Sequence, residues 1–500
     1  MTYNLSHIAA PSGRRIAWLM LVAAMLTGCA AGPDFRSPAA SDVASYTATP
    51  LPAQTASGPG AFGQPQHFMQ AGSAPGAWWQ QFGSAKLDAL IRQALSASPT
   101  LDAAQAVLRQ AEQNYAAQAG SSLYPQVNAK LGAQRQGVNG AALGQNGGNR
   151  VFNLYNTTVA VSYNLDLSGA NRRALEALAA QADYQRFQLQ GARLTLAANV
   201  AAAAFTQAQL AAQIETGTAI LAAESEQLAI TRERMELGAA SALDISALQA
   251  QLEQTRATLP PLRNRWQQTS HLLAVLAGQP PGAADMPQFK LTDFRLPADL
   301  PVTVPSALVR QRPDIQAAEA LLRAANAQHG VAVAKLYPQI NLSASMGSQA
   351  LTTTALFGSG SMIWGLAAQL TQPLFNRGLR AEARAAEAGF DAAAANYRQT
   401  VLQALRNVAD SLRALDNGAQ SMAALASATA AAQTSLQLVQ QQYRAGAASY
   451  VQVLTAQMQE QQTRTSLITA QAQRLTDTVA FYQAMGWGAD VSQTSAATGY

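Results

Sequence analysis

Leu237-Gly238-Ala239-Ala240-Ser241 is the stretch that decides the fold, because it returns almost unchanged as Ala445-Gly446-Ala447-Ala448-Ser449, 208 residues later. A second pair, Leu123-Tyr124-Pro125-Gln126-Val127 and Leu336-Tyr337-Pro338-Gln339-Ile340, repeats at an offset of 213 residues. A helix-opening segment repeats as well, as Pro99, Leu108 and Arg109 and again as Pro313, Leu322 and Arg323. A repeat of this length, carrying both helices and strands, indicates one unit built twice and folded beside itself.

The composition favours long, closely packed helices over a thick aromatic core. Only 12% of the residues are charged and 6% are aromatic, while alanine and glutamine are abundant. These residues have high helix propensity and small or flexible side chains. The formal charge of +5 falls to +3 when Arg14 and Arg15 are removed with the amino-terminal segment. A charge this weak and scattered argues against a nucleic-acid partner.

The amino terminus has the pattern of a targeting segment. Arg14-Arg15 precede a short apolar run over residues 16–25, and Leu26-Thr27-Gly28-Cys29 resembles a lipoprotein processing site. We therefore expect residues 1–28 to be removed and Cys29, the single cysteine, to carry lipid that anchors the chain to a membrane. Ala30-Ala31 place no acid beside the cysteine, which favours the outer membrane. An ordinary secretory signal with a chance cysteine is the alternative.

The repeat divides the rest of the chain into two equivalent halves. No stretch is long and apolar enough for a transmembrane helix. The expected organisation is a tether and equatorial region over 29–97, repeat 1 over 98–278, a proline-rich equatorial linker over 279–305, repeat 2 over 306–486, and a tail over 487–500.

Each half contains two segments in which apolar and polar residues alternate. The segments cover about 124–138 and 151–167 in repeat 1, and 337–350 and 361–374 in repeat 2. Val159, Val161, Tyr163 and Leu165, for example, fall on one face, and Ala160, Ser162, Asn164 and Asp166 on the other. Alternation of this length is typical of outer-membrane barrel strands. A soluble, half-buried hairpin is the alternative interpretation.

Two very long helices follow the strands, over roughly 170–237 and 377–445, and neither contains a proline. At 1.5 Å per residue each would reach about 100 Å. We expect Ser168 and Asn376 to cap their starts, and a left-handed glycine to follow each end. Ser241 with Asp244 and Ser449 with Gln452 have the spacing of capping boxes that begin two further helices of about 35 residues.

Four strands per chain cannot form a closed sheet. A sheet that spans a membrane must close, because open edges leave backbone groups unpaired in hydrocarbon, and closed barrels begin at about eight strands. Several chains must therefore share one barrel. Alanine and glutamine at the helix seams suit a wide ring of helices around an aqueous lumen.

The residues then resemble a known family. Cys29-Ala30-Ala31-Gly32-Pro33-Asp34-Phe35, followed by Trp78-Trp79, Phe82 and Leu87, is similar to the start of the lipoprotein (OprM/NodT-type) branch of the TolC-like outer-membrane factors. The duplicated Leu-Tyr-Pro-Gln and Gly-Ala-Ala-Ser segments are similar to that family too. The resemblance implies a mixed α and β fold assembled as a homotrimer. A twelve-stranded β-barrel would be continuous with a long α-helical barrel, plus a small equatorial region.

In this family the chain is the exit duct of a tripartite efflux pump, docked through its helical tips onto a periplasmic adaptor and served by an inner-membrane pump. The resemblance therefore places adaptor contacts on the two tips, 237–241 and 445–449. The residues concerned are Arg234, Gly238, Ala239, Ala240, Ser241, Arg444, Gly446, Ala447, Ala448 and Ser449. The plainer interpretation is that the glycines and serines only turn the chain.

The resemblance also suggests a periplasmic gate. Asp244 and Tyr443 match positions that link neighbouring hairpins in the archetypal member, although Asp244 is also explained as a capping acid. Where the archetype carries two acids lining the constriction, this chain has Gln452 and Thr455. That departure argues against an acidic, cation-binding gate at this level.

No pattern in the sequence indicates catalysis, a cofactor or a metal site. The four histidines are isolated, and no Cys/His cluster, phosphate loop or Ser/His/Asp pattern occurs. The favoured interpretation is a passive outer-membrane channel that exports drugs or other small molecules. The exit duct of a type I protein-secretion system is one alternative. A lipid-anchored periplasmic coiled-coil scaffold without membrane strands is another.

Overall fold

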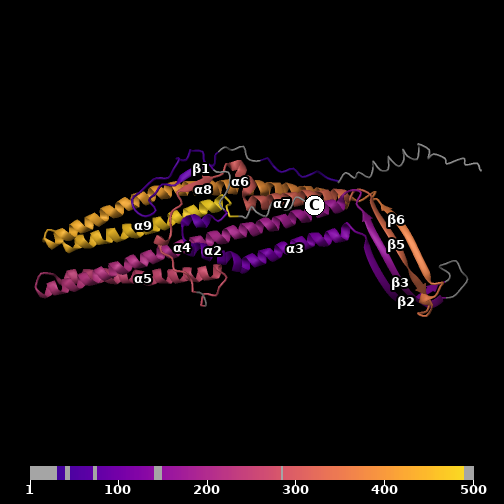
Figure 1. The fold of residues 1–500 in the computed structure, drawn as a ribbon, viewed down its shortest axis with the longest axis horizontal. Coiled ribbons are helices and arrows are strands. Elements are labelled where there is room, and N and C mark those ends of the chain that lie inside the picture. The colour runs from indigo at the N-terminus through magenta and orange to yellow at the C-terminus, as the bar shows by residue number, and fades with distance from the viewer. Residues whose placement is uncertain (1–30, 40–44, 71–75, 140–148, 283–284, 489–500) are drawn as a thin grey trace, which may run out of the picture. The chain divides into compact units, whose positions relative to one another are not determined.

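The computed structural model describes residues 31–39, 45–70, 76–139, 149–282 and 285–488. The chain divides into two compact units, and both repeats contribute to each (Figure 1). Unit 1 consists of residues 1–37, 108–184 and 318–397, and unit 2 of residues 38–107, 185–317 and 398–500. Cys29 and the signal segment lie outside the described residues. Within the described parts, none of the helices is apolar enough over a sufficient length to cross a membrane.

Unit 1 contains a four-stranded antiparallel sheet in the order β2-β3-β5-β6. Its strands are β2 (Gln126–Asn139), β3 (Asn149–Leu165), β5 (Gln339–Ala350) and β6 (Met362–Thr371). Each lies within three residues of the boundaries expected from the alternation. A short 3₁₀ turn, η4 (Ala355–Phe357), lies between β5 and β6.

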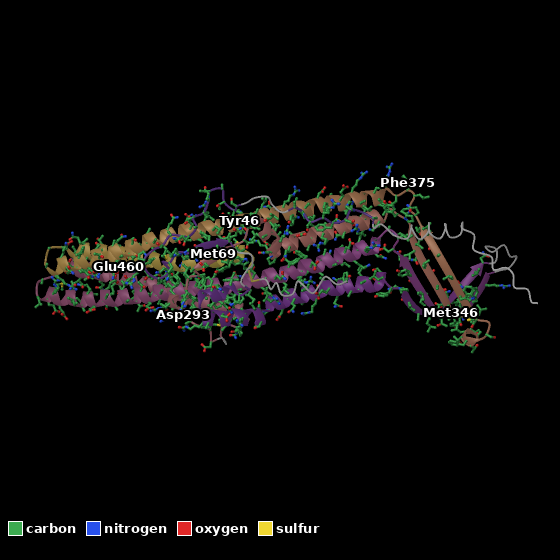
Figure 2. The ribbon with its side chains drawn as sticks, turned by 45° about the horizontal axis from the view of Figure 1, so that its top comes forward. Tyr46, Met69, Asp293, Met346, Phe375 and Glu460 are labelled. Carbon is green, nitrogen blue, oxygen red and sulfur yellow. The ribbon has the colours of Figure 1, made fainter. Side chains whose placement is uncertain are left out.

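The register collects the apolar residues of all four strands on one face. Val159 pairs with Ala129 on one side and with Met346 on the other, and Met346 pairs with Trp364. Because side chains alternate along a strand, this alignment confirms the faces expected from the sequence. The face is not covered by the chain: Leu131, Trp364 and Leu366 are 82%, 78% and 80% exposed, and Met346 is exposed beside them (Figure 2). A bare apolar sheet face suits hydrocarbon rather than water.

The helices of unit 1 begin and end beside these strands. They are the later part of α3 (Pro99–Ser122), the first part of α4 (Ala170–Glu236), the later part of α7 (Pro313–Ala334) and the first part of α8 (Arg377–Arg444). Asn376 Oδ1 accepts from the backbone N–H groups of Gly378 and Leu379, which confirms the expected cap of α8. The expected cap of α4 is wrong: the carboxylate of Asp166, not Ser168, accepts from the backbone of Asn171 and Arg172. An ionised carboxylate is favoured at a helix amino terminus.

Arg173 holds the amino-terminal segment against α4. Its buried guanidinium donates to the carbonyls of Ala31 and Gly32 and pairs with Asp34 at 2.7 Å. The backbone N–H of Ala31 also donates to the carbonyl of Ser168 at 2.8 Å. The chain is therefore fixed to the start of α4 two residues after Cys29.

Unit 2 contains two helical hairpins. The first joins α4 to α5 (Ala242–Leu276), and the second joins α8 to α9 (Tyr450–Ala484). As the sequence predicts, Gly238 and Gly446 follow the ends of α4 and α8, and Gly278 and Gly486 follow the ends of α5 and α9. The helix α5 continues through Pro260 and Pro261, although each proline removes one N–H from the helical ladder.

A cluster of buried aromatic side chains lies in unit 2. Trp78 and Phe82 of η1 (Trp78–Phe82), which precedes α2 (Ala85–Ala97), are fully buried. Tyr482 stacks on Trp78 at 5.4 Å, and Phe205 lies 4.9 Å from Phe82. Trp78, Phe82, Phe205 and Tyr482 therefore form one buried aromatic cluster within unit 2.

Several short strands and helices also belong to unit 2. The strand β1 (His67–Gln70) pairs in parallel with β4 (Asp299–Val302), and η3 (Leu291–Asp293) and α6 (Pro305–Gln311) lie next to β4 in the chain. The fully buried Arg474 of α9 donates to the carbonyl of Phe62 and, at 3.2 Å, to Thr55 Oγ1. Burial lowers the pKa of Arg474 to about 10. This arginine therefore holds residues 55–66 against the second hairpin.

Candidate functional site

The two helical tips turn with the same backbone geometry. Gly238 has a φ of +73° and Gly446 a φ of +76°, so each glycine occupies the left-handed region that other residues avoid. The N–H of Gly238 donates to the carbonyl of Met235 and that of Ala239 to the carbonyl of Arg234. Gly446 and Ala447 make the equivalent bonds to Tyr443 and Gln442. Both helices therefore end in a Schellman motif.

Both following helices begin with the expected capping box. Ser241 Oγ accepts from the N–H of Asp244 at 3.2 Å, and the Asp244 carboxylate accepts from the N–H of Ser241 at 3.0 Å. Ser449 and Gln452 form the same pair of bonds, with 2.7 Å from the N–H of Ser449 to Gln452 Oε1. The backbone N–H of Ser241, followed by its hydroxyl, lowers the pKa of Asp244. The first tip thus carries a fixed negative charge where the second carries a neutral amide.

Tyr443 joins the two hairpins through Arg234. The Arg234 guanidinium lies over the Tyr443 ring, 5.2 Å from its centroid, and the Tyr443 ring meets that of Tyr450 at 5.6 Å. In the described residues Asp244 and Tyr443 share no hydrogen bond; Asp244 bonds to Ser241 instead. Within one chain, therefore, Tyr443 contacts the first hairpin through Arg234 rather than through Asp244.

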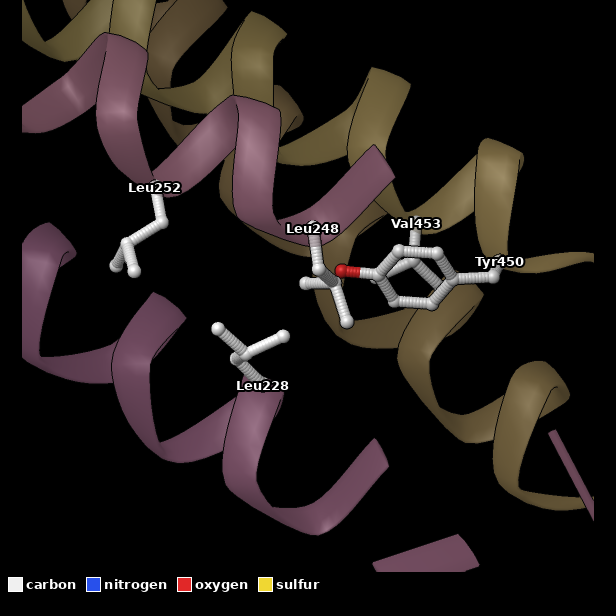
Figure 3. Close-up of a cluster of buried hydrophobic side chains, with 5 residues drawn as sticks. All are labelled: Leu228, Leu248, Leu252, Tyr450 and Val453. Carbon is white, nitrogen blue, oxygen red and sulfur yellow. The ribbon is translucent and has the colours of Figure 1, made fainter. Parts of the chain in front are cut away.

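A small apolar cluster packs the hairpins together just behind the tips. Leu228, Leu248 and Leu252 come from the first hairpin, and Tyr450 and Val453 from the second (Figure 3). All five are buried. The contact fixes the spacing of the two tips within one chain, because buried apolar side chains resist displacement.

Glu224 is a buried acid beside this cluster. It accepts from Thr255 Oγ1 at 3.1 Å and from Gln251 Nε2 at 3.3 Å, while its second carboxylate oxygen has no partner among the described residues. Burial raises the pKa of Glu224. The Tyr450 hydroxyl is also buried and has no hydrogen-bond partner among the described residues, so this region contains two buried polar groups that are not fully paired.

Each tip exposes large apolar side chains among its polar ones. Leu237 is 83% exposed and Leu243 is 75% exposed on the first tip, and Val451 is exposed on the second. Arg444, Gln452 and Thr455 are exposed at the second tip, where the Thr455 hydroxyl donates to the carbonyl of Val451.

Comparison with known proteins then assigns the chain to a family. The family model described as "Outer membrane efflux protein" matches residues 90–279 and 304–487, which is most of the chain. This chain belongs to the outer membrane efflux protein family.

Relatives align with the efflux protein over nearly all of its length. It is 32% identical over 420 residues to the pyoverdine export outer membrane protein OpmQ of Pseudomonas putida, covering 83% of this chain and 88% of OpmQ. It is 31% identical over 476 residues to the probable efflux pump outer membrane protein TtgC of the same species, covering 94% and 95%. The structure of the outer-membrane channel OprN superimposes with a TM-score of 0.82 and 28% identity, covering 92% of this chain and 99% of OprN. The mixed α and β fold is that of outer-membrane efflux channels.

Several residues of this efflux protein were not anticipated from the sequence. Leu243 and Val451 stand five residues after Gly238 and Gly446, and an apolar residue so close to a turn is a signal that could have identified them. Glu224 has no such signal, since its burial depends on contacts with α5. In the described residues no group of three potential metal ligands comes together.

Proposed function

We propose that this outer membrane efflux protein forms, as a homotrimer, the exit duct of a tripartite efflux pump through which small molecules pass passively to the exterior. The observation that carries the proposal is the sheet of unit 1, with one bare apolar face and two open edges. Open edges in hydrocarbon leave backbone groups unpaired, so the sheet must be completed by other copies. Three chains supply twelve strands, enough to close a barrel.

The names of the relatives support small organic substrates. OpmQ is named for pyoverdine export, and further relatives of Pseudomonas putida are named for toluene and antibiotic efflux. A protein-secretion duct of the same architecture remains the second candidate, but no feature of the described residues favours it. The scaffold alternative does not fit a four-stranded sheet with a bare apolar face.

Lipid on Cys29 is part of the proposal. Arg173 holds residues 31–34 beside Ser168. Ser168 lies three residues after the end of β3. A lipid attached at Cys29 would therefore enter the membrane next to the barrel. A fatty chain adds membrane affinity without spanning the bilayer.

The tips are proposed to dock a periplasmic adaptor through their exposed apolar residues. The shared backbone of the two turns would present similar surfaces, and the Arg234 and Arg444 side chains flank them. The gate is proposed to involve Tyr443, held by Arg234, with Asp244 close to it; Gln452 and Thr455 would add no charge at the constriction. If Asp244→Ala with Tyr443→Phe left conductance and antibiotic uptake unchanged, the gate would be elsewhere.

Gene deletion tests the proposed function most simply. A deletion strain is challenged with antibiotics, detergents and dyes, and complemented with the intact gene or with a Leu237→Asp/Leu243→Asp variant. We expect broad sensitisation that the intact gene reverses and the variant does not, while both proteins reach the outer membrane. Unchanged sensitivity across the panel, with loss of a secreted protein, would favour the secretion duct instead.

A further inference from the structure

A surface cavity lies in unit 1 where β6 ends and α8 begins. Its volume is about 490 Å³, and it is lined by residues 372–377 together with Leu336, Leu379 and Arg380. Gln372 Nε2 donates to the carbonyl of Leu336 at 3.1 Å, which joins the residues that follow β6 to those that precede β5. A cavity of this size can hold a small ligand.

Two large apolar side chains of the cavity are almost fully exposed. Leu374 is 93% exposed and Phe375 is 85% exposed. They follow the last residue of β6 by three and four positions, and Phe375 lies at the end of the sheet next to α8 (Figure 2). The Arg377 guanidinium lies over the Phe375 ring, 5.9 Å from its centroid. Aromatic residues gather in this way where a membrane barrel meets water, so a hydrocarbon chain is a suitable neighbour for this part of the cavity.

The cavity also begins a row of arginines on α8. Arg377, Arg380 and Arg384 have the spacing i, i+3, i+7, which places them on one face of the helix. All three are exposed, and in the part of the chain that the structure describes none has a hydrogen-bond or ion-pair partner. The acid on this part of α8, Glu382, is already paired with Lys335. The row therefore carries positive charge that the described chain does not neutralise.

Repeat 1 has acids at the equivalent place. At the offset of 208 that relates the two tips, Leu374 corresponds to Asp166, and Arg384 corresponds to Glu176. The Asp166 carboxylate accepts from backbone N–H groups at the start of α4, and Asp34 adds a second carboxylate through its ion pair on the same helix. The start of α4 thus has its anions within the chain, whereas the start of α8 has arginines and no unpaired acid. An anion from outside the chain would complement α8.

We propose that the cavity binds the headgroup of an anionic phospholipid, with the phosphate on Arg377 and Arg380 and the first part of the acyl chains against Leu374 and Phe375. The guanidinium fork matches the geometry of phosphate, and the positive end of a helix dipole favours an anion at the start of α8. A soluble phosphate compound would leave the two apolar side chains bare, which favours a lipid. The inference rests on the proposed function, which places the sheet in the outer membrane, and adds a lipid ligand to it.

Native mass spectrometry of the full-length protein in detergent tests the charged part of the site. Phosphatidylglycerol is compared with phosphatidylcholine of the same acyl chains, because both contain phosphate but only phosphatidylglycerol has a net negative charge. We expect phosphatidylglycerol to bind about tenfold more tightly. Arg377→Gln/Arg380→Gln should lose this preference, and Arg377→Lys/Arg380→Lys should keep most of it. Arg109→Gln/Arg172→Gln, which removes two exposed arginines of unit 1 outside the cavity, should leave the preference unchanged.

A second comparison tests the apolar part of the site and the source of the phosphate. Leu374→Ser/Phe375→Ser should weaken the binding of both lipids about tenfold, because the contact with the acyl chains is lost. Glycerol 3-phosphate, which has a phosphate and no acyl chain, is the soluble probe and should not displace bound phosphatidylglycerol at equal concentration. Displacement by this probe, or unchanged lipid binding by Leu374→Ser/Phe375→Ser, would assign the cavity to a soluble phosphate compound and overturn the proposal.

The remaining outcomes separate the lipid site from the proposed function. Equal binding of the two lipids by the wild type would overturn the lipid site. A preference kept by Arg377→Gln/Arg380→Gln, or lost to the same extent in Arg109→Gln/Arg172→Gln, would overturn it as well. The exit duct would stand in each case if the wild-type gene still reverses the sensitisation of the deletion strain. Failure of the wild-type gene to reverse it would instead overturn the proposed function, whatever the lipid binding.

Discussion

At the first tip the Asp244 carboxylate closes the capping box and Arg234 reaches the Tyr443 ring, whereas at the second tip the box is closed by the neutral Gln452. The turns themselves are alike, with φ values of +73° and +76° at the two glycines. Behind the turns the first hairpin also contains the buried Glu224 and the prolines Pro260 and Pro261.

The comparison shows that the two tips share their backbone geometry and differ in their side chains. Backbone hydrogen bonds and glycine geometry are common to both tips, so both can present a similar shape to a partner. The two carboxyl groups near the tips whose pKa the fold shifts, Asp244 and Glu224, belong to the first hairpin, so effects of pH are expected there. The second tip supplies Tyr443 and Tyr450, the aromatic side of the contact.

The largest expected effect comes from Leu248→Ala. Leu248 is fully buried in the cluster between the hairpins, and the equivalent position in the second hairpin is already alanine, Ala456. Removing a buried leucine costs about 2–5 kcal/mol because it leaves a cavity. Amide hydrogen exchange at both tips should accelerate accordingly. Val451→Ala, at an exposed position, is the matched control, and equal exchange in the two variants would show that the cluster does not hold the tips.

Replacing the glycines tests whether the two backbones are equivalent. A Cβ added at Gly238 or Gly446 would meet nothing within 4 Å, so the cost is conformational alone. We expect Gly238→Ala and Gly446→Ala to destabilise their hairpins by the same amount, about 1–2 kcal/mol, in hydrogen exchange. Gly120→Ala, at a helical glycine with equally free space, should not destabilise. A clear inequality between the two tips would contradict a shared geometry.

Replacing the capping side chains distinguishes the first tip, capped by a charged group, from the second tip, capped by a neutral one. Asp244→Ala and Gln452→Ala should each cost about 1 kcal/mol near neutral pH. The pKa of Asp244 is lower in the folded tip than in the unfolded chain. Its contribution is therefore full above the unfolded pKa of about 3.9 and is lost as the pH falls through the folded pKa. Hydrogen exchange measured from pH 7 to pH 3 should show the first tip losing the stabilisation by Asp244, while the stabilisation of the second tip by Gln452 stays constant. The same pH profile at both tips would contradict this difference.

Glu224→Gln should have the smallest effect and the opposite pH dependence. Because burial raises the pKa of Glu224, the folded hairpin binds the proton more tightly than the unfolded chain does. The destabilisation is full above the folded pKa and is relieved as the pH falls below it. Thermal unfolding of Glu224→Gln should lack this pH dependence. Glu226→Gln, at an exposed position on the same helix, is the control. An unaltered pH dependence in Glu224→Gln would assign that dependence to another group.

The regular elements of the fold could be predicted because their signals are local. Alternation located the strands, and the repeated Gly-Ala-Ala-Ser stretch located both turns to the residue. The capping boxes at Ser241 and Ser449 follow from a three-residue spacing and form as expected. Matching the two repeats also marked positions 244 and 452 as the place where the tips differ.

The remaining features depend on contacts between segments far apart in the sequence. Nothing near Arg474 indicates that its guanidinium is buried against residues 55–66, more than four hundred positions away. The pairing of β1 with β4 joins two strands of four residues, too short for a periodic pattern. The cap by Asp166 was missed because the acid stands four residues before the helix begins.

Single-channel conductance tests the central claim most directly. The purified protein is inserted into planar bilayers beside protein that chemical crosslinking keeps as a trimer. The account predicts discrete conducting events for both, since a closed sheet of three chains encloses an aqueous duct. Absence of conductance from a protein that is trimeric and membrane-inserted would contradict it.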